Sequence, residues 1–123
     1  METRKRPSPA ELSNEELIAT LDRLARYESR VTAVLVAHLA ELERRELHTA
    51  AGFRSLHEYC TERLHLSEHE AYLRITAGRM AGKFPRIPEL LASGDLHLTA
   101  VKLLAPCLIK SENPHELIDA ARH

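Results

Sequence analysis

The stretch from Leu66 to Pro85, LSEHEAYLRITAGRMAGKFP, predicts a helix with two different sides. Ser67 and Glu70 have the spacing of a capping box at its start. A residue before proline is disfavoured in the helical conformation, so the helix should end near Phe84. One broad side is small or apolar and is expected to pack against neighbouring helices. Its members are Ala71, Leu73, Ile75, Ala77, Gly78 and Met80.

The other side of this helix is a candidate binding surface. Its members recur at helical spacing and are Tyr72, Thr76, Arg79 and Lys83. A hydrogen-bonding aromatic ring, a hydroxyl and two cations on one stripe suit contacts to phosphates and base edges. With Arg74 and Arg86, the segment from Ala71 to Arg86 carries four bases and no acid, in a chain of net charge -1.

An alternative without any binding role stays open for the same helix, in which the polar side chains form only the solvated face of a structural helix. Glu68 and Glu70 occupy the first turn, where a recognition helix usually meets bases and where carboxylates repel phosphate. The same two acids also suit the cap and the helix dipole.

A shorter helical pattern precedes this helix. This pattern is SLHEYCTERL, which begins at Ser55. Ser55 suits the N-cap of a helix, and Glu58, three residues later, has the spacing of a capping box. A short helix, a tight turn and a longer helix form the skeleton of a helix-turn-helix, here from Leu56 to Lys83.

A long helix is predicted nearer the N-terminus, where Ser13 and Glu16 form another capping-box pattern. Spacings of four and three then alternate along Leu17, Leu21, Leu24, Glu28, Val31, Leu35, His38 and Leu42. The pattern runs to about Leu47, a helix of roughly 30 residues and about 45 Å. Either the helix bends around the rest of the chain, or part of its stripe packs against a second copy. His38 is expected to find its hydrogen bond within the chain.

The remaining segments also read as short helices. Pro88 suits the first turn of a helix that ends at Gly94. Thr99 is expected to cap the next helix, which Pro106 bends or breaks. Asn113 and Pro114 start the last one.

No segment alternates at period two, so the predicted fold class is all-α, with a long N-terminal helix plus a compact set of short helices containing a helix-turn-helix. Residues 1–12 are expected to form a flexible basic arm whose Arg4, Lys5 and Arg6 are candidates for phosphate contacts. Residues 13–123 form a single domain with the long helix at 13–47, the helix-turn-helix at 55–84 and short helices at 85–123.

Composition and residue patterns indicate an ordinary globular protein and give no sign of a membrane span, a metal site or an active site. Hydrophobic residues make up 44% and charged residues 28%, as in ordinary soluble domains. No apolar run is long enough for a bilayer and no apolar signal segment follows the first bases, which predicts a cytoplasmic protein. Cys60 and Cys107 are expected to be reduced and buried. The spacing of the eight histidines matches no metal site, and no cofactor motif or catalytic pair is evident.

The segment from Ser55 to Leu108 resembles the N-terminal region of bacterial HNH endonuclease-like proteins, a family that includes 13E12-repeat-type proteins. The resemblance is carried by SLHEYC, LSEHEAYLRI, FPRIPELLASGDLHLTAVKLLAP and ENPHELIDAARH, and extends back through the long helix. At the level of pattern the same region is similar to the helix-turn-helix of ParB-type partition proteins. In the first family a C-terminal nuclease module with metal-binding His and Asn residues follows, and nothing in this sequence matches that module.

The resemblance implies a DNA-associated helical domain without the chemistry of the family. We therefore expect a non-catalytic DNA-binding domain, not an enzyme, with contacts from Tyr72, Arg74, Thr76, Arg79, Lys83 and Arg86. Two alternatives stay open: a self-association module that forms a homodimer through the long helix, and the regulatory N-terminal part of an HNH nuclease whose catalytic module is absent.

Overall fold

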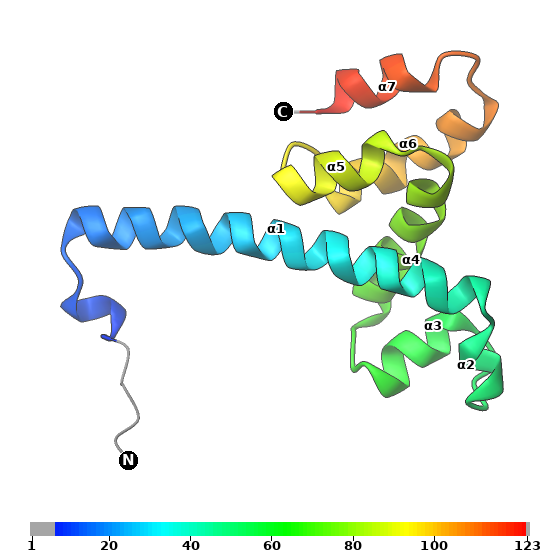
Figure 1. Ribbon diagram of the computed structural model, residues 1–123, viewed down its shortest axis with the longest axis horizontal. Coiled ribbons are helices and arrows are strands. Elements are labelled where there is room, and N and C mark those ends of the chain that lie inside the picture. Colours follow the sequence, from blue (N-terminus) through cyan, green and yellow to red (C-terminus); the bar gives the residue numbers. More distant parts are fainter. Residues whose placement is uncertain (1–6, 123) are drawn as a thin grey trace.

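The longest element of the fold is α1, Asn14–Arg44, which runs across the whole molecule (Figure 1). The structure is a computed structural model and describes residues 7–122. Ser13 caps α1 as predicted, because its Oγ accepts a hydrogen bond from the Glu16 N–H at 3.1 Å and the Glu16 carboxylate accepts one from the Ser13 N–H at 3.1 Å. Before it lies a single 3-10 turn, η1, Pro9–Glu11.

The long helix ends earlier than predicted. Glu46 has a φ of 54°, in the left-handed region, which interrupts the helical backbone after Arg44. Leu47–Ala50 then forms the separate one-turn helix α2, so the expected continuation to Leu47 is wrong. The sequence did not show this break because neither proline nor glycine stands between Leu42 and Leu47.

The next two helical segments lie where the helix-turn-helix pattern put them. Leu56–Glu58 is α3, and it passes without a break into the π-helical turn Tyr59–Arg63. After a short turn comes α4, Glu68–Lys83, capped by Ser67 and Glu70. The chain continues with α5, Arg86–Ser93, α6, Leu98–Lys110, and α7, Pro114–Ala121. No strand occurs among residues 7–122, and the all-α fold class is confirmed.

Three local predictions need correction. Helix α6 begins at Leu98 with His97 as its N-cap, so Thr99 is inside the helix and does not cap it. Pro106 does not end α6, which continues to Lys110. Cys60 is buried as expected, and burial raises the pKa of its thiol, but Cys107 is exposed because it lies on the outer side of α6.

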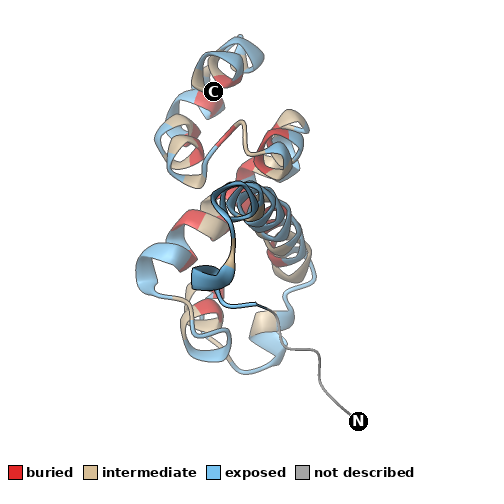
Figure 2. Cartoon of the chain, turned by 90° about the vertical axis from the view of Figure 1, so that its left-hand side faces the viewer, coloured by how far each residue is buried: buried red, intermediate tan, exposed pale blue. Residues whose placement is uncertain are grey.

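Helix α4 separates two clusters of buried side chains. The larger cluster joins α1 to α5, α6 and α7 and includes Ala77 and Met80 of α4. The smaller cluster joins α1 to α3 and the π-helical turn and includes Ala71 and Ile75 of α4. In Figure 2, which looks along α1 from its N-terminal side, the buried residues lie on helices to either side of α1. Helix α4 is therefore shared by both clusters of the core and contacts both α1 and α6.

The crossing of α1 and α4 is close because Gly78 has no side chain. A Cβ atom at Gly78 would lie 3.2 Å from the Val36 carbonyl oxygen and 3.5 Å from the Ala40 Cβ. Gly82, one turn later on α4, has nothing within 4 Å of its Cβ position. The crossing therefore needs glycine at 78 and tolerates a side chain at 82.

Leucine at these two positions tests the crossing. Both substitutions replace glycine by a better helix former, which by itself raises the free energy of unfolding by up to about 1 kcal/mol in a helix interior. Gly78→Leu should nevertheless lower the free energy of unfolding by about 1 to 3 kcal/mol, since it overpacks the crossing. Gly82→Leu should leave it unchanged or raise it. Urea denaturation measures both, and equal stabilities for the two variants would contradict the assigned role of Gly78.

Candidate nucleic-acid interface

Beyond its exposed first turn, helix α4 exposes a narrow strip of side chains. Tyr72, Arg79 and Lys83 are exposed and Thr76 is half-buried. These four residues, called the α4 strip below, are the stripe predicted from the sequence, and most of the remaining circumference of α4 is covered. The strip is therefore the part of α4 that a macromolecular ligand could reach.

A lysine from another helix extends the strip. Lys102 Nζ of α6 lies 5.5 Å from the centroid of the Tyr72 ring, in a cation–π arrangement. Lys102 was not among the predicted contacts, because only the packing of α6 against α4 brings it to Tyr72. An aromatic ring and a cation now stand together at the N-terminal end of the strip.

Arg79 is held by an acid from α1. Its Nε and Nη2 donate to the two carboxylate oxygens of Glu43 at 3.2 and 2.8 Å, a bidentate pair. This contact holds the pKa of the Glu43 carboxyl below its ordinary value and raises that of Arg79. Part of the positive charge predicted for the strip is thus neutralised within the domain.

Lys83 stands beside an open groove of about 390 Å³ between the end of α1 and the end of α4. Arg44 and Arg79 also line this groove, together with the acids Glu41 and Glu43. Arg44 pairs with Glu41, and hydrogen bonds from Arg44 and Arg45 lower the pKa of the Glu41 carboxyl to about 2. Lys83 makes no ion pair among the residues that the structure describes, so its charge is the most available in the groove.

Two further predicted contacts lie away from the strip. Arg74 is on the other side of α4, where its Nη1 donates to the Glu70 carbonyl at 3.2 Å and its side chain lines a hollow with α1 residues such as Glu28. Arg86, at the start of α5, forms an ion pair with Asp119 at 2.7 Å. The structure thus brings four of the six predicted residues together and separates these two from them.

The remaining candidates are those of the arm. Arg4, Lys5 and Arg6 lie outside the described residues. The acids in the first turn of α4 take the role expected of a cap, since hydrogen bonds from the Ser67 hydroxyl and the Ser67 N–H lower the pKa of the Glu70 carboxyl.

The described part of the chain was also compared with the requirements of a metal cluster and of a membrane span. No group of three or more His, Cys, Asp or Glu side chains within it could hold a metal ion. None of its helices combines the length and the apolarity that a bilayer span requires. His38, which interrupts the apolar spacing of α1, has its Nδ1 2.7 Å from the Val34 carbonyl oxygen, in agreement with the expected bond within the chain.

A family model described as a domain of unknown function, DUF222, matches residues 18–117. The chain belongs to the DUF222 family. The match extends from the first turns of α1 into α7 and so includes both core clusters and the α4 strip. No curated protein and no solved structure matches this DUF222 domain.

The Arg79–Glu43 pair should make stability depend on pH. Because the pKa of Glu43 is lowered on folding, the pair stabilises the domain above the ordinary pKa of 4.5 and loses this effect as pH falls through the lowered value. Glu43→Gln should therefore lower the melting temperature at pH 7, by an amount equivalent to less than about 1 kcal/mol for this partly exposed pair. The difference from the wild type should shrink below pH 4.5.

Thermal melts over a pH series measure this difference. Glu62→Gln is the matched control, because Glu62 is exposed and forms no ion pair within residues 7–122. A Glu43→Gln difference that stays constant from pH 7 to the acid end, or equals that of the control, would contradict the assignment.

Proposed function

We propose that this DUF222 domain is a non-catalytic module that binds DNA through the α4 strip and Lys102. The observation that carries the proposal is the alignment of Tyr72, Thr76, Arg79 and Lys83 along the exposed side of a mostly buried helix, with Lys102 next to Tyr72. Cations and hydroxyls suit phosphate oxygens, and an aromatic ring suits a sugar or base face.

The resemblance to the N-terminal region of HNH endonuclease-like proteins supports the same function. It also supports a finer proposal, that the domain holds DNA for a nuclease module supplied by another segment or another chain. The described residues contribute positioning to that reaction and no chemistry of their own.

The ion pairs set the expected strength of binding. Glu43 already engages Arg79, and the whole chain has a net charge of -1. Few cations are therefore available to displace the counterions of DNA, which is the main source of non-specific affinity. We expect weak binding with a shallow dependence on salt, in which Lys83 and Lys102 provide most of the attraction.

A fluorescence-anisotropy titration with random-sequence duplex DNA at low and moderate salt tests the proposal. Lys83→Ala should weaken binding and reduce the slope of log affinity against log salt by roughly one, the effect of one lost phosphate contact. Lys110→Ala, which removes an exposed lysine at the end of α6, is the matched control and should leave the slope unchanged.

Glu43→Gln gives the opposite expectation in the same titration. It removes a negative charge beside the strip and releases Arg79, so affinity and salt slope should both rise above those of the wild type. Undetectable binding at low salt, or a loss of affinity in the Lys110 variant equal to that in the Lys83 variant, would refute the proposed function.

A further inference from the structure

The first turns of α1 stand clear of the other α-helices, whereas Glu28 and Ser29 already border α4 and α5. Figure 1 shows these turns extending beyond the other helices, and the buried residues of α1 begin only at Ala33. A single helix without tertiary contacts is marginally stable in water, since most helix stability in proteins comes from packing of an apolar face. The outward face of these turns therefore lacks a partner that would stabilise it.

That face is apolar and exposed. It carries Leu17, Leu21, Leu24, Tyr27 and Val31, called the α1 strip below. The exposed fraction is 56% at Leu24 and 67% at Tyr27. A contiguous row of large apolar side chains on a soluble domain marks a site of protein–protein contact.

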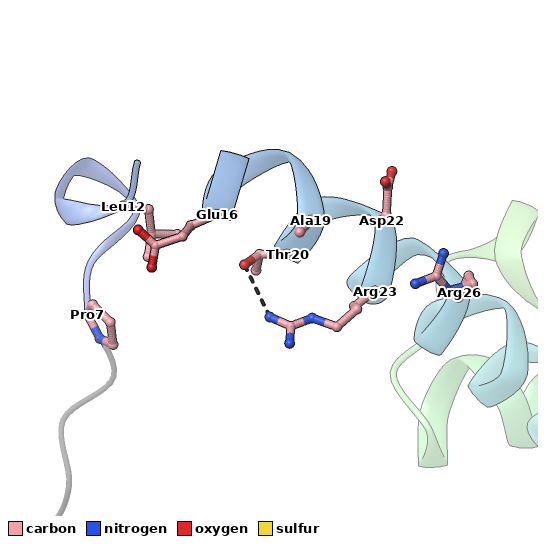
Figure 3. Close-up of a pocket in the computed structure, with 8 residues that line it drawn as sticks. All are labelled: Pro7, Leu12, Glu16, Ala19, Thr20, Asp22, Arg23 and Arg26. Atoms are coloured by element: carbon pink, nitrogen blue, oxygen red, sulfur yellow. Dashed lines mark hydrogen bonds between the residues drawn. The ribbon is translucent and has the colours of Figure 1, made fainter. Parts of the chain in front are cut away.

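The segment before α1 does not cover the α1 strip. It turns back beside α1 and leaves a groove of about 810 Å³ between the two (Figure 3). Pro7 and Leu12 line this groove together with Ala19 and Arg23 of α1, and Arg23 donates to the Thr20 hydroxyl at 3.3 Å. No residue of the α1 strip lines the groove.

The spacing of the α1 strip is symmetric about Leu24. Leu17 precedes Leu24 by seven residues, and Val31 follows it by seven. An antiparallel copy related by a two-fold axis at Leu24 would set Leu17 of each chain against Val31 of the other, and Leu24 against itself. A two-fold interface has this self-complementary form, because residue i contacts j and residue j contacts i.

The charges of the same segment are also complementary to an antiparallel copy. Glu15 to Asp22 holds three acids and no base, whereas Arg23 to Arg30 holds three bases and one acid. None of these charged side chains forms an ion pair within the described residues. An antiparallel pairing places the acidic stretch of each chain beside the basic stretch of the other, and a parallel pairing places like charges together.

A membrane surface is a poorer occupant of the strip, because amphipathic helices that bind lipid have a basic polar face and this one carries four acids against three bases.

We propose that the α1 strip binds a second copy of this chain, with the first halves of the two α1 helices antiparallel and a two-fold axis at Leu24. The pairing covers the apolar side chains that the fold leaves exposed and places the two domain cores at opposite ends of the helix pair. It does not depend on DNA binding.

Light scattering after size exclusion, over a range of protein concentrations, is the first test. The wild type should have the mass of two chains, and Leu24→Glu should have the mass of one, because the axis brings two carboxylates together. Ala19→Glu adds the same charge on the groove side of α1 and should remain a dimer. A monomeric wild type, a dimeric Leu24→Glu protein or a monomeric Ala19→Glu protein would overturn the proposal.

Disulfide crosslinking tests the direction of pairing independently. Cys107 is exposed, so the background is Cys107→Ser, whereas Cys60 is buried and can stay. A mixture of Leu17→Cys and Val31→Cys proteins should form the mixed disulfide on oxidation, and neither protein should crosslink alone. Efficient crosslinking of each protein with itself would show a parallel pair and overturn the antiparallel arrangement.

Discussion

The contact on which the rest of the structure depends is the crossing of α1 and α4 at Gly78. The helices lie so close there that even a Cβ atom on Gly78 would press against the Val36 carbonyl oxygen and touch Ala40. Val36, two neighbouring core residues of α1 and six residues of α4 are buried as a result. Because both clusters of the core contain residues of α1 and α4, displacing one helix from the other would disrupt both clusters together.

This crossing also determines which surfaces are left for function. Burial of α4 on most sides leaves the α4 strip as its exposed face beyond the first turn, and it places Glu43 of α1 close enough to hold Arg79. A helix enclosed in this way has little freedom to enter a groove of DNA deeply, so phosphate contacts are the natural role for its cations. Packing of the second half of α1 on α4 likewise leaves the α1 strip exposed.

Local signals in the sequence were sufficient for much of the fold. The serines at 13, 55 and 67 cap helices because capping depends on neighbours three residues away, and Gly94 ends α5 with a φ of 83°. The break at Glu46 was missed because a left-handed residue other than glycine leaves no sequence pattern. The start of α6 was missed because His97, unlike Thr99, is not a typical cap.

The candidate site was only partly predictable for a related reason. Helical spacing was enough to place Tyr72, Thr76, Arg79 and Lys83 on one strip. Whether a cation is available depends on partners distant in sequence, such as Glu43 for Arg79, which is 36 residues away, and Asp119 for Arg86. Lys102 joined the strip through packing of α6 on α4, which no periodicity in a single sequence reveals.

The central claim is that α1 has two parts, a second half fixed in the core by the crossing at Gly78 and a first half stabilised by a second chain. Amide hydrogen exchange at low and high protein concentration tests it most directly. The account predicts strong, concentration-independent protection of the amides near Gly78 in α4, and protection of residues 17–30 that rises with concentration. Protection of residues 17–30 that equals that of α4 at every concentration, or that never changes with concentration, would contradict it.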